Sequence, residues 1–304
     1  MIRALEPSPR GVYCGAIGVL RPGGHATFNV AIRTVTLTGR RATCGIGSGI
    51  TSDATAPAEW QEWQHKRRFL DQASHSFNLL ETLRLEGGVF QHLNLHLARL
   101  QSAARHFGYP FDESRVRNAL QALDWPQASP SPANPQPGAI IAPASSPAWR
   151  VRLQLDAHGT PLTEKFALNS TPALVNIALS ATYFESSDSE FTRFKTSRRD
   201  HYEAFAPRDP AVFDTLLFNR RGELTECTRG NIALLLDGRW VTPALHCGLL
   251  PGVGRAYWLQ NGRVIEAVIT LADLPRAQGV AFINALRGWV NAQLTGQTRA
   301  TGID

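Results

Sequence analysis

The sequence predicts a protein of the α+β class, in which strands form hairpins and do not alternate regularly with helices. Hydrophobic residues make up 43% of the 304 residues and charged residues 18%, which is enough apolar material for a folded core. Strand-like runs are separated by glycine-containing turns, and segments of helical periodicity lie between groups of such runs. No run of about 18 apolar residues occurs, so no membrane-spanning segment is expected.

The first part of the chain predicts a sheet followed by a helix. Residues 10–50 contain glycine-rich breaks between runs of partly alternating apolar and polar residues, which indicate two or three strands of an antiparallel sheet. A helix is predicted over 57–73, because Pro57 suits a first helical turn and Trp60 and Trp63 lie at helical spacing.

A second unit is predicted to start near residue 74. The segment FNLLETLRLEGGVF predicts a strand, a Gly-Gly turn and a second strand. LNLHLARLQSAARHF then predicts an amphipathic helix that ends at Gly108, since glycine accommodates the left-handed backbone of a helix end. The predicted apolar face consists of Leu93, Leu97, Leu100 and Ala104. A short helix is predicted over 113–123.

The rest of the chain is predicted to be rich in strands. Seven prolines among Ala and Ser over 126–147 predict a loop that packs no core. Strands are predicted from WRVRLQL, within 165–183, and from DTLLFNRRGELTEC and GNIALLLDGRWVTPA. Helical patterns lie near 252–261 and 272–276, and VAFINAL is predicted to be the final strand.

The charge distribution does not predict a nucleic-acid-binding protein. Lys and Arg number 31 and Asp and Glu 25, which gives a formal charge of +6, but the basic residues are scattered along the chain. The four cysteines form no CxxC motif, so free thiols are expected. The first residues contain no apolar stretch of signal-peptide length, and a cytoplasmic location is therefore expected.

Only three lysines are present, which limits the candidates for chemistry that needs an amine. Lys66 is expected to lie beside Glu59 and Glu62 on the predicted helix, which raises its pKa, and Lys165 has no distinctive neighbours. Lys195 lies between aromatic residues and two arginines in FTRFKTSRRD, and both kinds of neighbour favour the neutral, nucleophilic amine. The same local sequence also suits a surface lysine in a basic loop.

The downstream segment adds a carboxylate and a possible anion seat. Glu226 follows a predicted hairpin turn, and the glycine-rich GLLPGVGR can open a helix at Val253–Gly254 whose free N–H groups would hold a phosphate. Pyridoxal phosphate requires a lysine for the Schiff base, a carboxylate for the pyridine nitrogen and donors for the phosphate. The three features together therefore predict a site for this cofactor.

Six motifs follow one another from about Ser76 to Leu294: FNLLETLR, HLARL, FKTSRRDHY, GELTECTRGNI, TPALHCGLLPGVGR and FINALRGW. In these motifs and their order the region resembles the class IV aminotransferase family, which includes branched-chain and D-amino-acid aminotransferases and aminodeoxychorismate lyase. The resemblance implies a two-lobed, fold-type IV enzyme (D-amino-acid aminotransferase-like) that binds pyridoxal 5′-phosphate. Its small lobe is expected over 74–184 and its large, cofactor-binding lobe over 185–304.

The resemblance also implies roles for individual residues. Lys195 matches the Schiff-base lysine, Glu226 the carboxylate that pairs with the pyridine nitrogen, and Arg99 the arginine that binds the phosphate. Taken alone, Arg99 also suits an exposed helix arginine, and Glu226 an ordinary turn residue. The further cofactor-binding positions that the resemblance implies are Arg199, Asn231, Val253, Gly254, Asn284, Ala285 and Leu286.

Within the family, ETLRLEGGVF, KTSRRDHYEA, NRRGELTECTRGN and INALRGW are similar to the aminodeoxychorismate lyase subgroup. That similarity implies elimination of pyruvate from 4-amino-4-deoxychorismate to form 4-aminobenzoate, a folate precursor. Lys195 would act as general base and acid, and Thr82 lies where this subgroup places a hydroxyl near the cofactor. The alternatives are a branched-chain or D-amino-acid aminotransferase, or an inactive fragment of a synthase fusion.

Residues 8–70 resemble a different family, the C-terminal end of the chorismate-binding synthases, through SPRGVYCGAIG, FNVAIRT, GIGSGI and AEWQEWQHK. The resemblance implies that Tyr13 and Arg33 contact the substrate and that Glu59 and Glu62 bind Mg²⁺. Without that resemblance, the spacing of the two glutamates favours a solvated helix face over a metal site. Because the other motifs of the synthase family are absent, 1–73 is expected to be a truncated piece without synthase activity or a functional Mg²⁺ site, with exposed strand edges.

The two resemblances occur in the order synthase piece, then lyase. A synthase of this family makes the compound that the lyase consumes, so the order favours the lyase over a general aminotransferase. The family further implies a homodimer, and the complete synthase a glutamine amidotransferase partner; neither a nucleic acid nor a membrane is expected as a partner.

Overall fold

The computed structural model describes residue 6 and residues 9–39, 41–74, 76–124 and 147–295. The chain divides into two compact units, Met1–Ser76 and Phe77–Asp304, which are described separately. The boundary lies three residues after the predicted end of the first unit at residue 73. Among the described residues, no helix is both long enough and apolar enough to cross a membrane.

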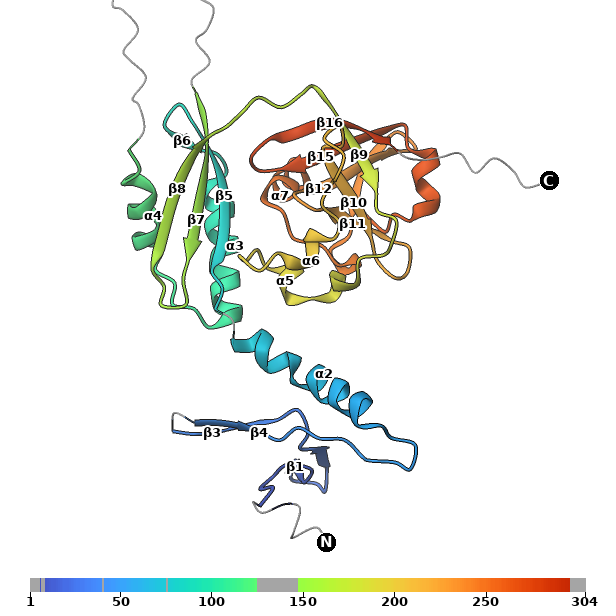
Figure 1. Cartoon of the computed structure of the whole chain (residues 1–304). Coiled ribbons are helices and arrows are strands. Elements are labelled where there is room, and N and C mark those ends of the chain that lie inside the picture. Colours follow the sequence, from blue (N-terminus) through green and yellow to red (C-terminus); the bar gives the residue numbers. More distant parts are fainter. Residues whose placement is uncertain (1–5, 7–8, 40, 75, 125–146, 296–304) are drawn as a thin grey trace, which may run out of the picture. The chain divides into compact units, whose positions relative to one another are not determined.

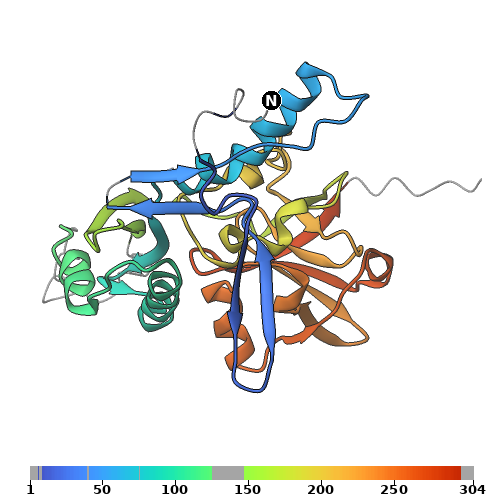
Figure 2. The same ribbon diagram turned by 90° about the horizontal axis from the view of Figure 1, so that it is seen from below.

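The first unit consists of two separate hairpins and one helix (Figure 2). Strands β1 (Ala16–Leu20) and β2 (Ala26–Val30) form one hairpin, and β3 (Val35–Thr38) and β4 (Arg41–Cys44) form the other. Helix α2 (Ala56–Ser74) follows, one residue longer at each end than predicted. The expectation of one sheet with two or three strands is therefore wrong, because the four strands pair only as neighbours in sequence.

The first hairpin exposes both of its faces. Every residue of β1 and β2 is exposed, including Leu20 at 74% and Phe28 at 60%. A two-stranded hairpin by itself buries too little apolar surface for independent stability. Because each sheet of this unit has only two strands, each of these strands has one edge without a neighbouring strand among the described residues, as expected.

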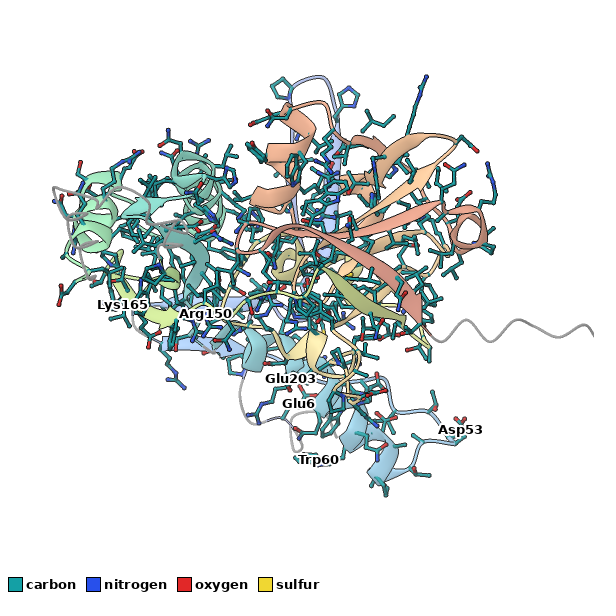
Figure 3. All side chains as sticks on the ribbon, turned by 90° about the horizontal axis from the view of Figure 1, so that it is seen from above. Glu6, Asp53, Trp60, Arg150, Lys165 and Glu203 are labelled. Carbon is teal, nitrogen blue, oxygen red and sulfur yellow. The ribbon has the colours of Figure 1, made fainter. Side chains whose placement is uncertain are left out.

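The second unit begins with a small antiparallel sheet in the strand order β6-β5-β7-β8 (Figure 1). The bounds of its strands are β5 Leu79–Glu86, β6 Val89–Phe90, β7 Ala148–Leu155 and β8 Pro161–Ala167. Arg150 on β7 and Lys165 on β8 mark this sheet in Figure 3. The predicted loop over 126–147 lies, except for Pro147, outside the described residues.

Two helices accompany this sheet, and both follow from local sequence signals. Helix α3 (Leu93–Phe107) buries Leu97, Leu100 and Ala104 against the sheet. It ends at Gly108, whose φ of 70° is the left-handed conformation that glycine tolerates. Helix α4 (Glu113–Gln121) begins after Asp112, whose carboxylate accepts hydrogen bonds from the first-turn N–H groups.

The larger sheet has eight strands in the order β11-β10-β9-β16-β15-β12-β13-β14. Their bounds are β9 Leu174–Leu179, β10 Asp214–Phe218, β11 Leu224–Cys227, β12 Asn231–Leu236, β13 Arg239–Pro243, β14 Ile265–Ala267, β15 Gly279–Asn284 and β16 Gly288–Thr295. Three of its pairings are parallel, β9 with β10, β9 with β16 and β13 with β14, so the sheet is mixed. The fold is α+β, as predicted.

Two features of the large sheet differ from the sequence expectation. β9 lies within 74–184, the range expected for the small lobe, but it pairs with β10 and β16 of the large sheet. The prediction that VAFINAL is the final strand is wrong, since β16 follows it and lies between β15 and β9. Both pairings join segments far apart in sequence, which local periodicity does not reveal.

Short helices connect the strands of the larger lobe. Their bounds are η1 Glu185–Asp188, α5 Glu190–Arg193, α6 Asp200–Glu203, η2 Leu245–Cys247, α7 Val253–Gln260 and η3 Leu271–Arg276. The predicted helix near 272–276 is a 3₁₀ helix. α7 starts at Val253, where the sequence predicted a helix opening. Each of the two sheets of the second unit has its own apolar core.

Candidate active site

A cavity of about 390 Å³ lies within the second unit, lined by residues of both lobes. Its lining from the small lobe comprises Leu80, Thr82, His96, Arg99, Arg150 and Arg152. Its lining from the remaining segments comprises Lys195, Arg199, Phe213, Arg229, Asn231, Leu250, Gly252, Val253, Phe282, Asn284, Ala285, Leu286 and Arg287. Nine of the eleven catalytic and cofactor-binding residues expected from the sequence line this cavity; Glu226 and Gly254 lie outside its lining.

Lys195 is held in this cavity by the edge of the small sheet. The backbone N–H of Leu80 donates to the Lys195 carbonyl over 2.9 Å, and Thr196 forms a bridge with Leu79. Burial, together with the charges of Arg199 and Arg99, lowers the pKa of the Lys195 amine to about 7. The amine is therefore substantially neutral near pH 7 and able to act as a nucleophile or a base.

Glu226 lies on β11 and is only 3% exposed. The Tyr202 hydroxyl donates to Oε1 over 2.6 Å, and the Leu250 N–H donates to Oε2 over 3.1 Å. Burial nevertheless raises the pKa of this carboxyl to about 7, because the two hydrogen bonds and the charges of Arg199 and Lys195 only partly offset it. A cationic N–H group beside Glu226 would compensate this burial.

Arg99 is held in position by a buried network of charged and polar groups. The Arg99 Nε donates to Glu81 Oε1 over 2.8 Å, and its Nη1 donates to the Pro251 carbonyl over 3.2 Å. His96 Nδ1 lies 2.7 Å from Glu81 Oε2. His96 lines the cavity, and its buried Nε2 has no hydrogen-bond partner among the described residues.

Sequence reasoning missed Glu81 and His96, although β5 carries a signal for the first. Leu79, Leu83 and Leu85 alternate along the buried face of β5, and Glu81 falls on that same face. A carboxylate on an apolar strand face requires a buried partner, and that requirement points to a functional or structural ion pair.

The start of α7 forms a seat of free backbone N–H groups. Gly252 occupies the N-cap position without a side-chain hydrogen bond, so the first N–H groups of α7 have no side-chain cap. A Cβ on Gly252 would lie 1.9 Å from Asn231 Oδ1, and one on Gly254 would lie 2.5 Å from the Asn284 carbonyl carbon. Close packing therefore requires glycine at both positions.

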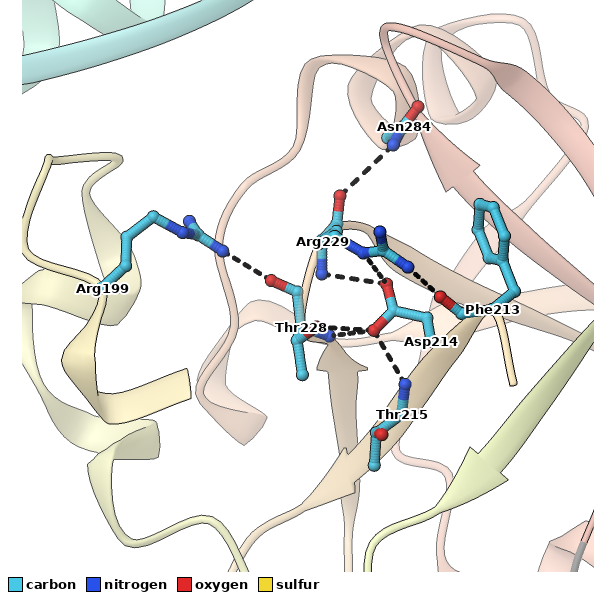
Figure 4. A network of polar contacts seen from close by, with 7 residues as sticks. All are labelled: Arg199, Phe213, Asp214, Thr215, Thr228, Arg229 and Asn284. Atoms are coloured by element: carbon cyan, nitrogen blue, oxygen red, sulfur yellow. Dashed lines mark hydrogen bonds and ion pairs between the residues drawn. The ribbon is translucent and has the colours of Figure 1, made fainter. Parts of the chain in front are cut away.

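The buried Asp214 holds the turn at Thr228 and Arg229, which lies between β11 and β12 (Figure 4). Asp214 is fully buried and accepts hydrogen bonds from the N–H groups of Thr215, Thr228 and Arg229. The carbonyl oxygens of this turn accept in their own right, from the Arg199 guanidinium at Thr228 and from Asn284 Nδ2 at Arg229. The sequence did not indicate Asp214, Thr228 or Arg229, because their proximity depends on the pairing of β10 with β11.

The first unit has a separate open cavity of about 880 Å³, which is lined by Tyr13 but not by Arg33. Glu59 accepts a hydrogen bond from the Ser48 hydroxyl, and Glu62 forms an ion pair with Lys66. Within the described part of the chain, no group of three or more His, Cys, Asp or Glu residues is arranged to hold a metal ion. The two expected Mg²⁺ ligands thus have partners of their own.

The second unit is a two-lobed α+β structure in which one cavity is lined by a lysine of lowered pKa and by the start of α7, and a buried glutamate lies on β11. Residues 78–294 match the family described as amino-transferase class IV, and the chain belongs to this family. It is 27% identical over 224 residues to a Schizosaccharomyces pombe protein assigned as an aminodeoxychorismate lyase, covering 69% of this chain and 86% of that protein. A Mesorhizobium loti crystal structure, assigned as an amino-acid aminotransferase, has 32% identity and a TM-score of 0.60, covering 72% of this chain and 99% of that chain.

Residues 1–72 match a second family, described as chorismate binding enzyme. A similar protein is aminodeoxychorismate synthase component 1 from Salmonella typhimurium, with 42% identity over 62 residues. That match covers 20% of this chain and only 14% of the synthase component. The first unit therefore corresponds to a small part of the curated synthases that it resembles.

The class IV family implies pyridoxal phosphate, and the residues around the cavity fit this cofactor. Lys195 has the lowered pKa that covalent attachment of the cofactor needs, and the uncapped N–H groups of α7 suit a phosphate. Glu226 is a buried carboxylate that a pyridine N–H would complete. The enzyme is therefore pyridoxal-phosphate-dependent, with Lys195, Glu226, Arg99 and the start of α7 as the groups that would hold the cofactor.

The pKa of Lys195 predicts how cofactor uptake depends on pH. Below about pH 7 the neutral fraction of the amine falls about tenfold per pH unit, so the rate of pyridoxal phosphate uptake by cofactor-free protein should fall likewise and level off above pH 7. Stopped-flow absorbance measures this rate. Free Nα-acetyl-lysine amide, which has an amine of ordinary pKa, is the control. Its reaction rate should keep rising with pH up to about pH 10. A protein profile that also keeps rising to pH 10 would contradict the lowered pKa.

Gly254→Ala should weaken cofactor binding without altering any charged group. The new Cβ would meet the backbone carbonyl carbon of Asn284 at 2.5 Å, so the start of α7 and the 284–286 turn must move apart. A displacement of about 1 Å at such a site can cost about 100-fold, and we expect pyridoxal phosphate affinity to fall by about 10- to 100-fold. Absorbance titration measures the affinity. Gly49→Ala, where a Cβ meets nothing within 4 Å, should bind as the wild type does.

Proposed function

We propose that this enzyme converts 4-amino-4-deoxychorismate into 4-aminobenzoate and pyruvate. The observation that carries the proposal is the presence, in one chain, of a chorismate-binding segment and a class IV domain. The synthase component that resembles the first segment and the lyase that resembles the second bear names that refer to the same compound.

The proposed reaction is an elimination that needs no second substrate. The ring carbon bearing the amine loses a proton, the bond from the ring to the enolpyruvyl oxygen breaks, and the ring becomes aromatic. The proton that the ring loses is balanced by the one that enolpyruvate gains as it becomes pyruvate. The cofactor, when bound, withdraws electrons from the carbon that loses the proton.

The chain's own residues supply the proton transfers and the orientation. Lys195, with a pKa of about 7, is suited both to take the ring proton and to return a proton to enolpyruvate. Thr82 on β5 lines the same cavity, and in this proposal its hydroxyl orients the substrate. Glu226, which is buried on β11, would pair with the pyridine nitrogen and keep it protonated when the cofactor is bound.

The second candidate function is amino-acid transamination. It is favoured by the 32% identity to the Mesorhizobium loti protein assigned as an amino-acid aminotransferase. The same lysine and carboxylate serve both reactions, so the residues around the cofactor do not discriminate between them.

A product assay separates the two candidates. Purified enzyme loaded with pyridoxal phosphate is incubated with 4-amino-4-deoxychorismate and no keto acid, and 4-aminobenzoate is measured by fluorescence after chromatography. We expect 4-aminobenzoate and pyruvate in equal amounts. No 4-aminobenzoate, together with amino transfer once a keto acid and a branched-chain or D-amino acid are supplied, would establish the aminotransferase instead.

A further inference from the structure

The cavity of the second unit is lined by an excess of positive charge. Among its described lining residues are six arginines and Lys195, and no aspartate or glutamate. The arginines are Arg99, Arg150, Arg152, Arg199, Arg229 and Arg287. Like charges that are gathered in a partly buried cavity repel one another more strongly than in water, so the arrangement favours the binding of anions.

Several of these arginines have carboxylate partners outside the cavity lining. Arg99 pairs with Glu81, and Arg229 lies 3.4 Å from Asp214. Arg152 lies 4.0 Å from Glu164 on the neighbouring strand β8. These three arginines are thus at least partly neutralised within the protein.

The other three arginines, Arg150, Arg199 and Arg287, form no ion pair with an acidic residue among the described residues. Arg199 donates to the Thr228 carbonyl, and its charge acts on the buried Glu226. The Arg150 guanidinium lies 4.5 Å from the centre of the Phe166 ring. Arg287 donates to the Asn169 carbonyl over 3.4 Å and to the Thr171 hydroxyl. The neutral groups around Arg150 and Arg287 orient their guanidinium groups and leave the charges uncompensated.

The surroundings of Arg287 add to this imbalance. Arg287 is half-buried, and burial together with the charges of Arg229, Arg150 and Arg84 lowers its pKa. Its charged neighbours are thus cations, of which Arg84 also pairs with Glu86. An anion bound among Arg287, Arg150 and Arg229 would relieve the repulsion and would suit the bidentate geometry of guanidinium groups.

We propose that Arg150 and Arg287, with Arg229 beside them, form a subsite for the carboxylates of the substrate. This subsite is separate from the seat formed by Arg99 and the start of α7, which is assigned to the cofactor phosphate. It selects substrates that carry carboxylates in addition to the reacting amine. The identity of the substrate rests on the proposed function, since 4-amino-4-deoxychorismate carries two carboxylates.

The test compares a dicarboxylate with a monocarboxylate on the same ring. Binding of isophthalate and of benzoate to the cofactor-loaded enzyme is measured by isothermal titration calorimetry. The variants are Arg150→Gln, Arg287→Gln and Arg287→Lys, and the matched control is Arg220→Gln, an exposed arginine paired with Glu185 outside the cavity lining. Thermal unfolding and the visible absorbance of bound pyridoxal phosphate are recorded for every variant.

We expect the wild type and Arg220→Gln to bind isophthalate at least about tenfold more tightly than benzoate. Arg150→Gln and Arg287→Gln should each weaken isophthalate binding by about 10- to 100-fold, with cofactor affinity unchanged. Arg287→Lys should recover part of the loss because it retains the charge. In turnover assays the same Gln variants should raise KM much more than they lower kcat.

The outcomes also separate this proposal from the proposed function. Wild-type isophthalate affinity in both Gln variants would overturn the subsite, and so would loss of the cofactor, since the arginines would then serve its phosphate. If the wild type makes 4-aminobenzoate while both variants keep a wild-type KM, the subsite is wrong and the lyase stands. If an arginine-dependent preference for isophthalate exists but no 4-aminobenzoate forms, the subsite stands and the lyase falls.

Discussion

Lys195→Ala is expected to reduce product formation by at least about 1000-fold and to abolish the visible absorbance band of bound pyridoxal phosphate. The variant loses the amine that attaches the cofactor and the base that moves the proton. Of the three lysines in the chain, Lys195 alone lines the cavity of the second unit. Its pKa of about 7 gives it the neutral form that both roles require.

Lys165→Ala is the matched control for this experiment. Lys165 lies on β8 with its amine 5.1 Å from the centre of the Trp149 ring, and it is absent from the cavity lining. We expect this variant to retain both the absorbance band and turnover. Absorbance and product formation are measured on the two variants side by side. The assignment of Lys195 would be refuted if Lys195→Ala kept the band and Lys165→Ala lost it.

Glu81→Gln is expected to destabilise the second unit by about 3 to 5 kcal/mol, the usual cost of removing one partner from a buried ion pair. Glu81 is 1% exposed and lies against both Arg99 and His96. The variant leaves the Arg99 charge without its carboxylate. Urea unfolding measures the change, and Glu164→Gln is the control, because that exposed carboxylate lies 4.0 Å from Arg152 and should contribute at most about 1 kcal/mol.

The pH dependence of stability provides an independent measurement of the same network. Burial by itself would raise the pKa of Glu81, but the charge of Arg99 and the contacts with His96 outweigh it and lower the pKa to about 2, from an ordinary 4.5. A carboxyl whose pKa is lower in the folded state stabilises that state at pH values above its pKa in the unfolded state. This contribution to stability is lost as the pH falls from 4.5 towards 2. The loss is about 3 kcal/mol for the wild type and should be absent in Glu81→Gln; equal acid sensitivity of the two would contradict the pairing.

Local sequence signals predicted most of the helices and strands correctly. Helices α2, α3 and α4 lie within two residues of their predicted bounds, because helical periodicity and end signals such as Gly108 and Asp112 act over a few residues. The hairpin of β5 and β6 was predicted for the same reason, through its Gly-Gly turn. Strand order was not, and β9 and β16 occupy the middle of the large sheet through pairings with distant segments.

The candidate site likewise has features that the sequence predicted and features that only the tertiary structure shows. Lysine scarcity, the aromatic and arginine neighbours of Lys195 and the glycine-rich GLLPGVGR segment indicated a lysine and an anion-binding helix start, because these are properties of residue type and local spacing. The roles of Lys195 and Glu226 were then implied by the resemblance to the class IV family. The pKa values of Lys195 and Glu226, the pairing of Glu81 with Arg99, and the gathering of Arg150 and Arg287 at one cavity emerge only in the folded chain. Desolvation and electrostatic interaction depend on distances between segments that are remote in sequence, and only tertiary packing sets those distances.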